Sequence, residues 1–239
     1  MRGAPRLRTA VVVAAAAAVT LGGLTACSDD PPAANGTVVL ADVSQSANKG
    51  ELVDSATSEF LAAVRSANAP ATVTLYAFNT QVGSEDCKPL VATVKWDRNS
   101  TNVDDEKAKL VAQAPAAVKK YYACVDEKMQ APGTDIFGGI AEAANLLKNV
   151  PGTRTIELVS DGCNNSYDTD LCSLSVVDAG WRAERIKALP DSMKPDLSGI
   201  TLNVSGLAKN ADLNSAQVQG LKSFFSEYAE VTHAEYTTN

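Results

Sequence analysis

The sequence predicts an α/β fold, a doubly wound and mainly parallel sheet with helices on both faces. Segments typical of strands alternate with segments of helical periodicity from about residue 37 onward. Residues 37–41 form a short apolar run, and residues 155–159 form a second apolar strand of the same kind. Each run leads into an acidic turn, so the polar side chains of both turns are expected at one edge of the sheet.

The remaining elements of the first half follow from local patterns. Residues 53–64 carry apolar side chains at helical spacing and predict an amphipathic helix. Residues 71–79 are β-branched and aromatic and predict a strand, with residues 90–96 as its candidate partner. Residues 103–129 predict two helices divided at Pro115, because proline suits a first helical turn and not a helix interior.

The second half continues the same alternation. Residues 136–147 predict a helix with one apolar face and two glycines that allow close approach of its first turn. Residues 181–189 predict another helix, residues 200–204 a strand, and residues 218–228 a closing helix. The alternation therefore extends to the end of the chain.

The N-terminal segment predicts export and a lipid anchor. A basic start is followed by an Ala- and Val-rich core that is short for a membrane span. Leu24-Thr25-Ala26-Cys27 resembles a bacterial lipobox, which implies cleavage before Cys27 and a diacylglyceryl group on its sulfur. We expect a signal peptide at 1–26, the lipidated Cys27 and a tether at 27–36, and one domain at 37–239. The domain would be anchored to the cell membrane and face outside the cytoplasm.

The charge balance disfavours nucleic acid as a partner. The 239-residue chain has a formal net charge of −7, which becomes −10 once the three arginines of the signal peptide are removed. Nucleic acid and anionic lipid headgroups are poor partners for such a chain.

The cysteines agree with export. Besides Cys27 the chain has four, an even number that predicts two disulfides outside the cytoplasm. Three pairings are possible. We favour Cys163–Cys172, because the segment between them is short and polar, which leaves Cys87–Cys124. None of the four has the Cys-x-x-Cys spacing typical of zinc sites.

Three segments carry the candidate site. Asp42, Ser44 and Ser46 leave the end of the first strand on alternate residues, and a carboxylate with two hydroxyls can hold a hard cation. Thr134 stands before a predicted helix, and Asp161 follows the strand at 155–159. Taken singly, Thr134 would serve equally well as a helix cap and Asp161 as part of an ordinary turn.

Together these segments resemble the von Willebrand factor type A (VWA) domain with its metal-ion-dependent adhesion site. The resemblance covers the chain from about residue 37 onward and implies five ligands: Asp42, Ser44, Ser46, Thr134 and Asp161. All are oxygen donors, which favours Mg²⁺, with Mn²⁺ and Ca²⁺ as alternatives. The resemblance also implies that a Glu or Asp of a partner protein completes the shell of the ion. Thr134 and Asp161 would then change between direct and water-mediated contact.

One stretch departs from the family pattern. The segment before Thr134 is long and carries Cys124 beside Tyr121 and Tyr122. It would either shape the choice of partner or cover an edge of the sheet.

Three functions compete. The first is a lipid-anchored module that recognises an acidic residue of a partner protein through the metal. The second is an assembly scaffold of the cell envelope with a purely structural ion. The third, a metal-dependent hydrolase, lacks an evident general base, because the single histidine, His233, lies in the C-terminal helix pattern as an expected surface residue. We therefore expect no enzymatic activity.

Overall fold

Strands and helices alternate along the protein. The computed structural model describes residues 31–44, 49–80, 87–207, 209 and 213–238. The strands are β1 (Asn35–Asp42), β2 (Ala71–Phe78), β3 (Leu90–Val94), β4 (Arg154–Val159), β5 (Ile200–Ser205) and β6 (Glu235–Thr238). The α-helices are α1 (Lys49–Ser66), α2 (Ser100–Lys128), α3 (Ile136–Leu147), α4 (Ala179–Ala188) and α5 (Ser215–Thr232). Two short 3₁₀ helices are η1 (Leu174–Val177) and η2 (Asp191–Met193).

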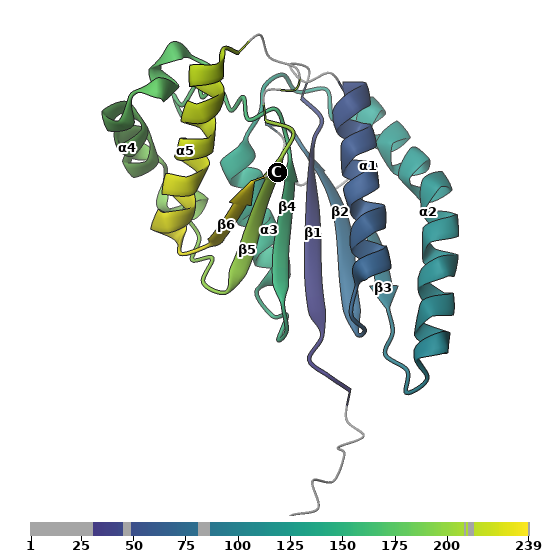
Figure 1. Ribbon diagram of the computed structural model, residues 1–239. Coiled ribbons are helices and arrows are strands. Elements are labelled where there is room, and N and C mark those ends of the chain that lie inside the picture. Colours follow the sequence, from purple (N-terminus) through teal and green to yellow (C-terminus); the bar gives the residue numbers. More distant parts are fainter. Residues whose placement is uncertain (1–30, 45–48, 81–86, 208, 210–212, 239) are drawn as a thin grey trace, which may run out of the picture. The chain divides into compact units, whose positions relative to one another are not determined.

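The strands form one sheet in the order β3-β2-β1-β4-β5-β6. Every neighbouring pair is parallel except β2 and β3, which are antiparallel. The chain starts in the middle of the sheet, moves outward to β3, and then returns to build the other half from β4 to β6 (Figure 1). This is the strand order of a doubly wound sheet, so the predicted fold class is confirmed.

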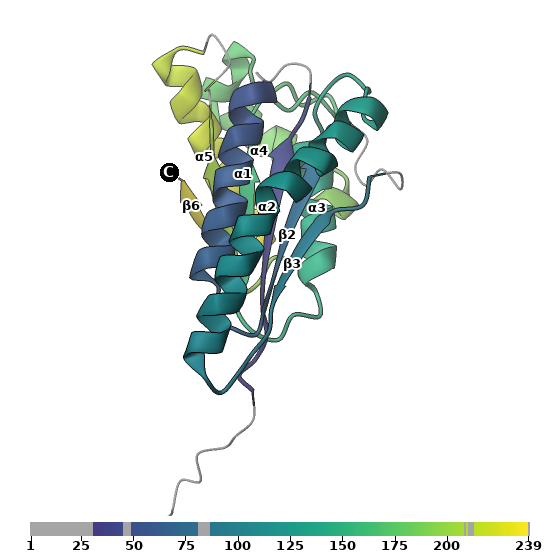
Figure 2. The same ribbon diagram turned by 90° about the vertical axis from the view of Figure 1, so that its right-hand side faces the viewer.

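A hydrophobic core lies on each face of the sheet. Successive side chains of a strand point to opposite faces, and β1 divides its residues accordingly. Val39 and Ala41 belong to the core that contains α1 and α2, whereas Val38 and Leu40 belong to the core that contains α3, α4 and α5. Figure 2 shows α1 and α2 on one side of the strands and α3 on the other. Because both of its faces are covered, β1 is continuously apolar from Val38 to Ala41.

The prediction of two helices divided at Pro115 is wrong. Residues Ser100–Lys128 form the single helix α2, with Pro115 inside it. Proline in a helix interior displaces the preceding turn and removes one backbone hydrogen bond. The Pro115 side chain is exposed, and Figure 2 shows the helix bending rather than ending.

Helix α2 also covers the edge of β2. Strand β3 pairs with β2 only from Ala71 to Leu75, so the backbone of Ala77 lies beyond the end of β3. The Ala77 N–H instead donates to the hydroxyl of Tyr121 on α2, with a distance of 2.7 Å between the nitrogen and the oxygen. A side chain of α2 therefore takes the place of a missing strand, which supports the edge-covering alternative for this stretch.

We expect Tyr121→Phe to lower the free energy of unfolding by about 1–2 kcal/mol, because the buried Ala77 N–H would lose its acceptor. Tyr122→Phe is the matched control. The Tyr122 hydroxyl is buried and has no hydrogen-bond partner among the described residues, so its removal is expected to be neutral or slightly stabilising. Urea unfolding of both variants provides the measurement. Equal losses in the two would show that the Ala77 hydrogen bond contributes nothing specific.

The C-terminal end differs from the predicted closing helix. Helix α5 ends at Thr232, and His233 caps it in a left-handed conformation with φ of 61°. Glu235–Thr238 then form β6 beside β5. This strand is short and polar, so it carries no apolar run that would have revealed it. His233 is exposed, as predicted, and its Nδ1 lies 3.3 Å from a carboxylate oxygen of Asp196.

The predicted signal peptide and Cys27 lie outside the described residues. Strand β1 begins at Asn35, within the predicted tether. None of the helices in the described ranges is long and apolar enough to cross a membrane.

Candidate metal centre

Two of the candidate ligands lie where adjacent parallel strands end. Asp42 is the last residue of β1, and Asp161 follows the end of β4 after one intervening residue, Ser160. The two strands are paired through Ala41 and Val159, so both acidic turns leave the sheet side by side. Figure 1 shows these strand ends at the top of the view, opposite the start of β1.

Asp42 is completely buried, and both of its carboxylate oxygens accept hydrogen bonds. Oδ1 accepts from the Ser44 N–H at 3.0 Å, and Oδ2 accepts from the Ser160 hydroxyl at 2.7 Å. Burial raises the pKa of Asp42 from 3.8 to about 6, and the nearby Asp161 contributes in the same direction. The hydrogen bonds lower the pKa but do not compensate for burial. A positive charge close to Asp42 would therefore stabilise its ionised carboxylate.

Ser44, the second predicted ligand of this segment, is buried beside Asp42. Its hydroxyl also hydrogen-bonds the Asp42 carboxyl. Ser46, the third predicted ligand of this segment, lies outside the described residues.

Thr134 lies across the end of β1. On one side, the Asp135 N–H donates to the carbonyl oxygen of Asn79, which directly follows β2. On the other side, the Thr134 N–H donates to Oδ1 of Asn165 in the segment after β4. Since β1 lies between β2 and β4, these contacts place Thr134 over the strand that ends at Asp42.

The hydroxyl of Thr134 is buried and has no hydrogen-bond partner among the described residues. Buried hydroxyls in proteins are almost always hydrogen-bonded, so an unsatisfied one calls for a partner beyond those that the described residues supply. A cation bound at this edge would be such a partner. The unsatisfied Thr134 hydroxyl is therefore the observation that best supports the predicted ion.

Asp161 is 1% exposed, and its Oδ1 accepts a hydrogen bond from the Cys163 N–H at 2.9 Å. Burial raises its pKa as well. Asp42 and Asp161 are thus two neighbouring buried carboxylates, and the pKa of each is raised. A divalent cation bound at this edge would stabilise the ionised form of both.

Asp135 has a different task. Its Oδ1 accepts from the Gly138 N–H at 2.9 Å, so Asp135, and not Thr134, caps α3. The hydroxyls of Ser166 and Tyr167 also donate to this carboxylate, at 3.2 and 3.0 Å. Asp135 thus holds the start of α3 and the segment after β4 together.

The described donors suit a hard cation. Within the described ranges, no group of three or more His, Cys, Asp or Glu side chains could hold a metal ion. The candidate centre instead combines the carboxylates of Asp42 and Asp161 with the hydroxyls of Ser44 and Thr134. Such an oxygen set fits Mg²⁺, Mn²⁺ or Ca²⁺ and disfavours zinc or copper.

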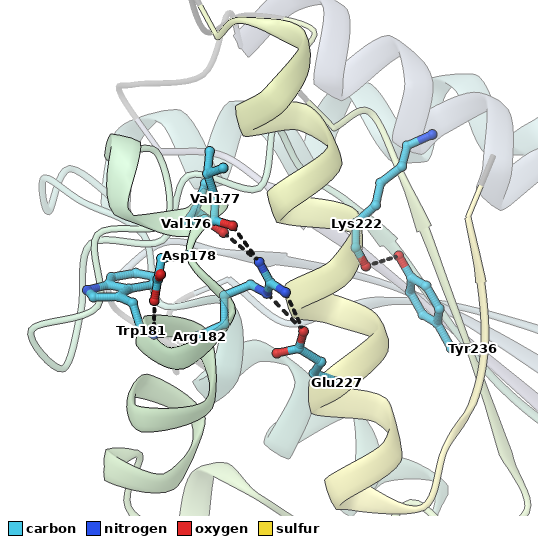
Figure 3. A network of polar contacts seen from close by, with 8 residues as sticks. All are labelled: Val176, Val177, Asp178, Trp181, Arg182, Lys222, Glu227 and Tyr236. Atoms are coloured by element: carbon cyan, nitrogen blue, oxygen red, sulfur yellow. Dashed lines mark hydrogen bonds and ion pairs between the residues drawn. The ribbon is translucent and has the colours of Figure 1, made fainter.

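Both predicted disulfides are present, Cys87–Cys124 and Cys163–Cys172. The second closes residues 163–172, which we call the rim loop and which begins two residues after Asp161. The far end of the rim loop leads into η1, which is held by Arg182 of α4 (Figure 3). The Arg182 guanidinium donates to the carbonyl oxygens of Val176 and Val177, at 3.1 Å each, and to Glu227 of α5, at 2.7 and 2.9 Å. The rim loop is thus anchored at both ends.

Sequence reasoning did not assign three residues of this site. Ser160 bonds Asp42, and Asn164 and Asn165 of the rim loop bond the backbone around Thr134. Ser160 had a local signal, because it stands beside Asp161 at a strand end. The asparagines had none, since Asn in a polar loop normally indicates only a turn.

Comparisons of the sequence with protein-family models and with curated proteins find no match. Solved structures similar to the chain include a von Willebrand factor type A protein from Catenulispora acidiphila, at 15% identity and a TM-score of 0.42 over 84% of this chain and 43% of that one. The PilB minor pilin of Streptococcus sanguinis is 15% identical, with a TM-score of 0.43 over 86% of this chain and 56% of that one. An aerotolerance-related membrane protein from Bacteroides fragilis is 14% identical, with a TM-score of 0.39 over 86% of this chain and 91% of that one. The fold of the chain is defined by its own strand order and register.

Proposed function

We propose that the protein binds a divalent cation, Mg²⁺ in first place, and uses it to recognise an acidic side chain of a partner protein. The ligands would be Asp42, Ser44, Ser46, Thr134 and Asp161. The observation that carries the proposal is the buried Thr134 hydroxyl, which has no hydrogen-bond partner among the described residues and stands over the strand that ends at Asp42. A bound cation would supply the positive charge that these two carboxylates and the hydroxyls lack.

The ligand set supports recognition of an outside carboxylate. Hydroxyl ligands carry no charge, so a divalent ion keeps a net positive charge unless both Asp42 and Asp161 bind it directly. A Glu or Asp of a partner would offset that charge. Catalysis has less support, because His233 is exposed and the Asp135 carboxylate already accepts three hydrogen bonds.

The proposed function includes the lipid on Cys27 that the lipobox at residues 24–27 implies. This lipid would hold the domain at the cell membrane, outside the cytoplasm, where partner proteins of the envelope are available.

Capture of partners from a cell-envelope extract tests this function. The immobilised chain from Ser28 onward contains the compact unit Pro31–Asn239. We expect proteins to be retained in Mg²⁺, to be released by EDTA, and to be absent from immobilised Thr134→Ala. Thr57→Ala, which removes a hydroxyl from α1 that bonds the Val53 carbonyl, is the control and should capture like the wild type.

Partners that stay bound after chelation and also bind Thr134→Ala would contradict metal-dependent recognition. If EDTA then lowered only the melting temperature of the wild type, the scaffold function with a structural ion would replace it.

A further inference from the structure

The rim loop, closed by Cys163–Cys172, binds the segment that carries Thr134 along its length. Asn164 Oδ1 accepts a hydrogen bond from the Ile136 N–H at 3.0 Å. The hydroxyls of Ser166 and Tyr167 donate to the carboxylate of Asp135. Every residue from Thr134 to Ile136 therefore has a partner in the rim loop.

Asn165 holds Thr134 itself. Its Oδ1 accepts from the Thr134 N–H at 2.8 Å, and its own N–H donates to the Thr134 carbonyl oxygen at 3.3 Å. Both polar backbone groups of Thr134 thus bond to one residue. Loss of the bond to the Asn165 side chain would remove one of these two constraints on the Thr134 backbone.

The residue before Thr134 confirms how closely the Asn165 amide is fitted. Gly133 has φ of 91°, and a Cβ placed on it would lie 2.7 Å from Asn165 Oδ1 and 3.0 Å from Thr80 Cγ2. The Asn165 side chain therefore occupies the space that a side chain at position 133 would need. Its amide is packed at this turn although Asn165 is an exposed residue.

The backbone of Thr134 decides where its hydroxyl points. Threonine is β-branched, so its χ1 angle has few accessible values and its Oγ1 follows the orientation of the backbone. We propose that Asn165 is a positioning residue, which fixes the Thr134 backbone so that its hydroxyl is aimed at the bound cation. This role rests on the proposed function and specifies how the rim loop contributes to metal affinity. Contacts of this kind, one step removed from the ion, typically change metal affinity by about 10- to 100-fold.

Mn²⁺ titration of the chain from Ser28 onward tests the role. Asn165→Ala is expected to weaken Mn²⁺ binding about tenfold, whereas Asn165→Asp, which keeps an acceptor oxygen, should stay within about threefold of the wild type. In a Thr134→Ala background, Asn165→Ala should add less than about a twofold effect, because the hydroxyl that it positions is gone. A merely structural role would give the same loss in both backgrounds.

Asn99→Ala is the matched control. Asn99 caps α2 through the Thr101 N–H at 3.0 Å, and α2 begins at the opposite end of the sheet from Asp42. The Asn99→Ala variant loses a comparable hydrogen bond from a backbone N–H to an asparagine side chain, and it should bind Mn²⁺ as tightly as the wild type. Hydrogen exchange of the Thr134 amide gives a readout without metal and is expected to be faster in Asn165→Ala but not in Asn99→Ala.

The outcomes separate the two levels of the proposal. Wild-type Mn²⁺ affinity in Asn165→Ala, equal losses with and without the Thr134 hydroxyl, or unchanged exchange of the Thr134 amide would overturn the positioning role and leave the proposed function in place. Failure of the wild type to bind Mn²⁺ would overturn the proposed function, and the positioning role with it.

Discussion

Replacement of Asp42 by asparagine is expected to weaken Mg²⁺ and Mn²⁺ binding by at least about 100-fold, because it removes a charged ligand at the centre of the site. The same change should stabilise the metal-free protein at neutral pH. Asparagine keeps an oxygen for the Ser44 N–H but carries no charge that burial would penalise. Loss of binding together with a gain in stability would be the signature of a site built for an ion.

The pH dependence follows from the raised pKa of Asp42. The folded protein holds this proton up to about pH 6, whereas the unfolded chain releases it near the ordinary value of 3.8. The contribution of Asp42 to stability is therefore fully present below pH 3.8 and is lost as the pH rises through 6. At 1.36 kcal/mol per pKa unit, the full loss amounts to about 3 kcal/mol, of which about 1.4 kcal/mol falls between pH 5 and pH 8. A bound divalent cation should remove this loss, because it compensates the buried charge.

Urea unfolding at pH 5 and pH 8, with EDTA and with saturating Mg²⁺, measures both effects. Asp105→Asn, which neutralises an exposed carboxylate near the start of α2, is the control for a change in net charge. Wild-type Mg²⁺ affinity in Asp42→Asn would remove Asp42 from the ligand set. A wild-type stability in EDTA that does not fall between pH 5 and pH 8 would contradict the raised pKa.

The sequence was most informative where a buried strand ends. A continuous apolar run predicts a strand that is buried on both faces. Asp42 and Asp161 each stand at the end of such a run, and the topology of a parallel sheet brings the ends of these strands to one edge. Thr134 was found by a different route, from its place before a helix in the order that the VWA resemblance implies. Its position over β1 depends on contacts with Asn79 and Asn165, which no local pattern records.

Errors arose where tertiary contacts outweigh local preference. Pro115 would end an isolated helix. In the folded protein, residues of α2 before and after Pro115 pack in the same core as α1 and the strands, and the proline ring itself is exposed. The polar residues of β6 do not favour a strand by themselves, and they form one by pairing with the outer edge of β5. Asn165 is similar, since its role derives from the partner that the fold supplies.

The two disulfides are expected to affect stability and metal affinity in opposite order. Cys87 and Cys124 are 37 residues apart, whereas Cys163 and Cys172 are 9 apart. From the entropy of loop closure in the unfolded chain, removal of the first bridge should cost about 4 kcal/mol and removal of the second about 2.5 kcal/mol. The second bridge, however, closes the rim loop that holds Thr134, so its loss should weaken Mn²⁺ binding more than loss of the first.

Serine at both cysteines of each pair gives the two variants, compared by urea unfolding in EDTA and by Mn²⁺ titration. Cys87→Ser with Cys124→Ser should show the larger fall in stability, and Cys163→Ser with Cys172→Ser the larger fall in affinity. If the affinities instead followed the stabilities, metal binding would report only how well the domain is folded. If the 163/172 variant instead loses less stability but more Mn²⁺ affinity than the 87/124 variant, the rim loop acts on the ion through local geometry. A general loss of stability could not produce that result, because the variant that is less destabilised would bind the ion more weakly.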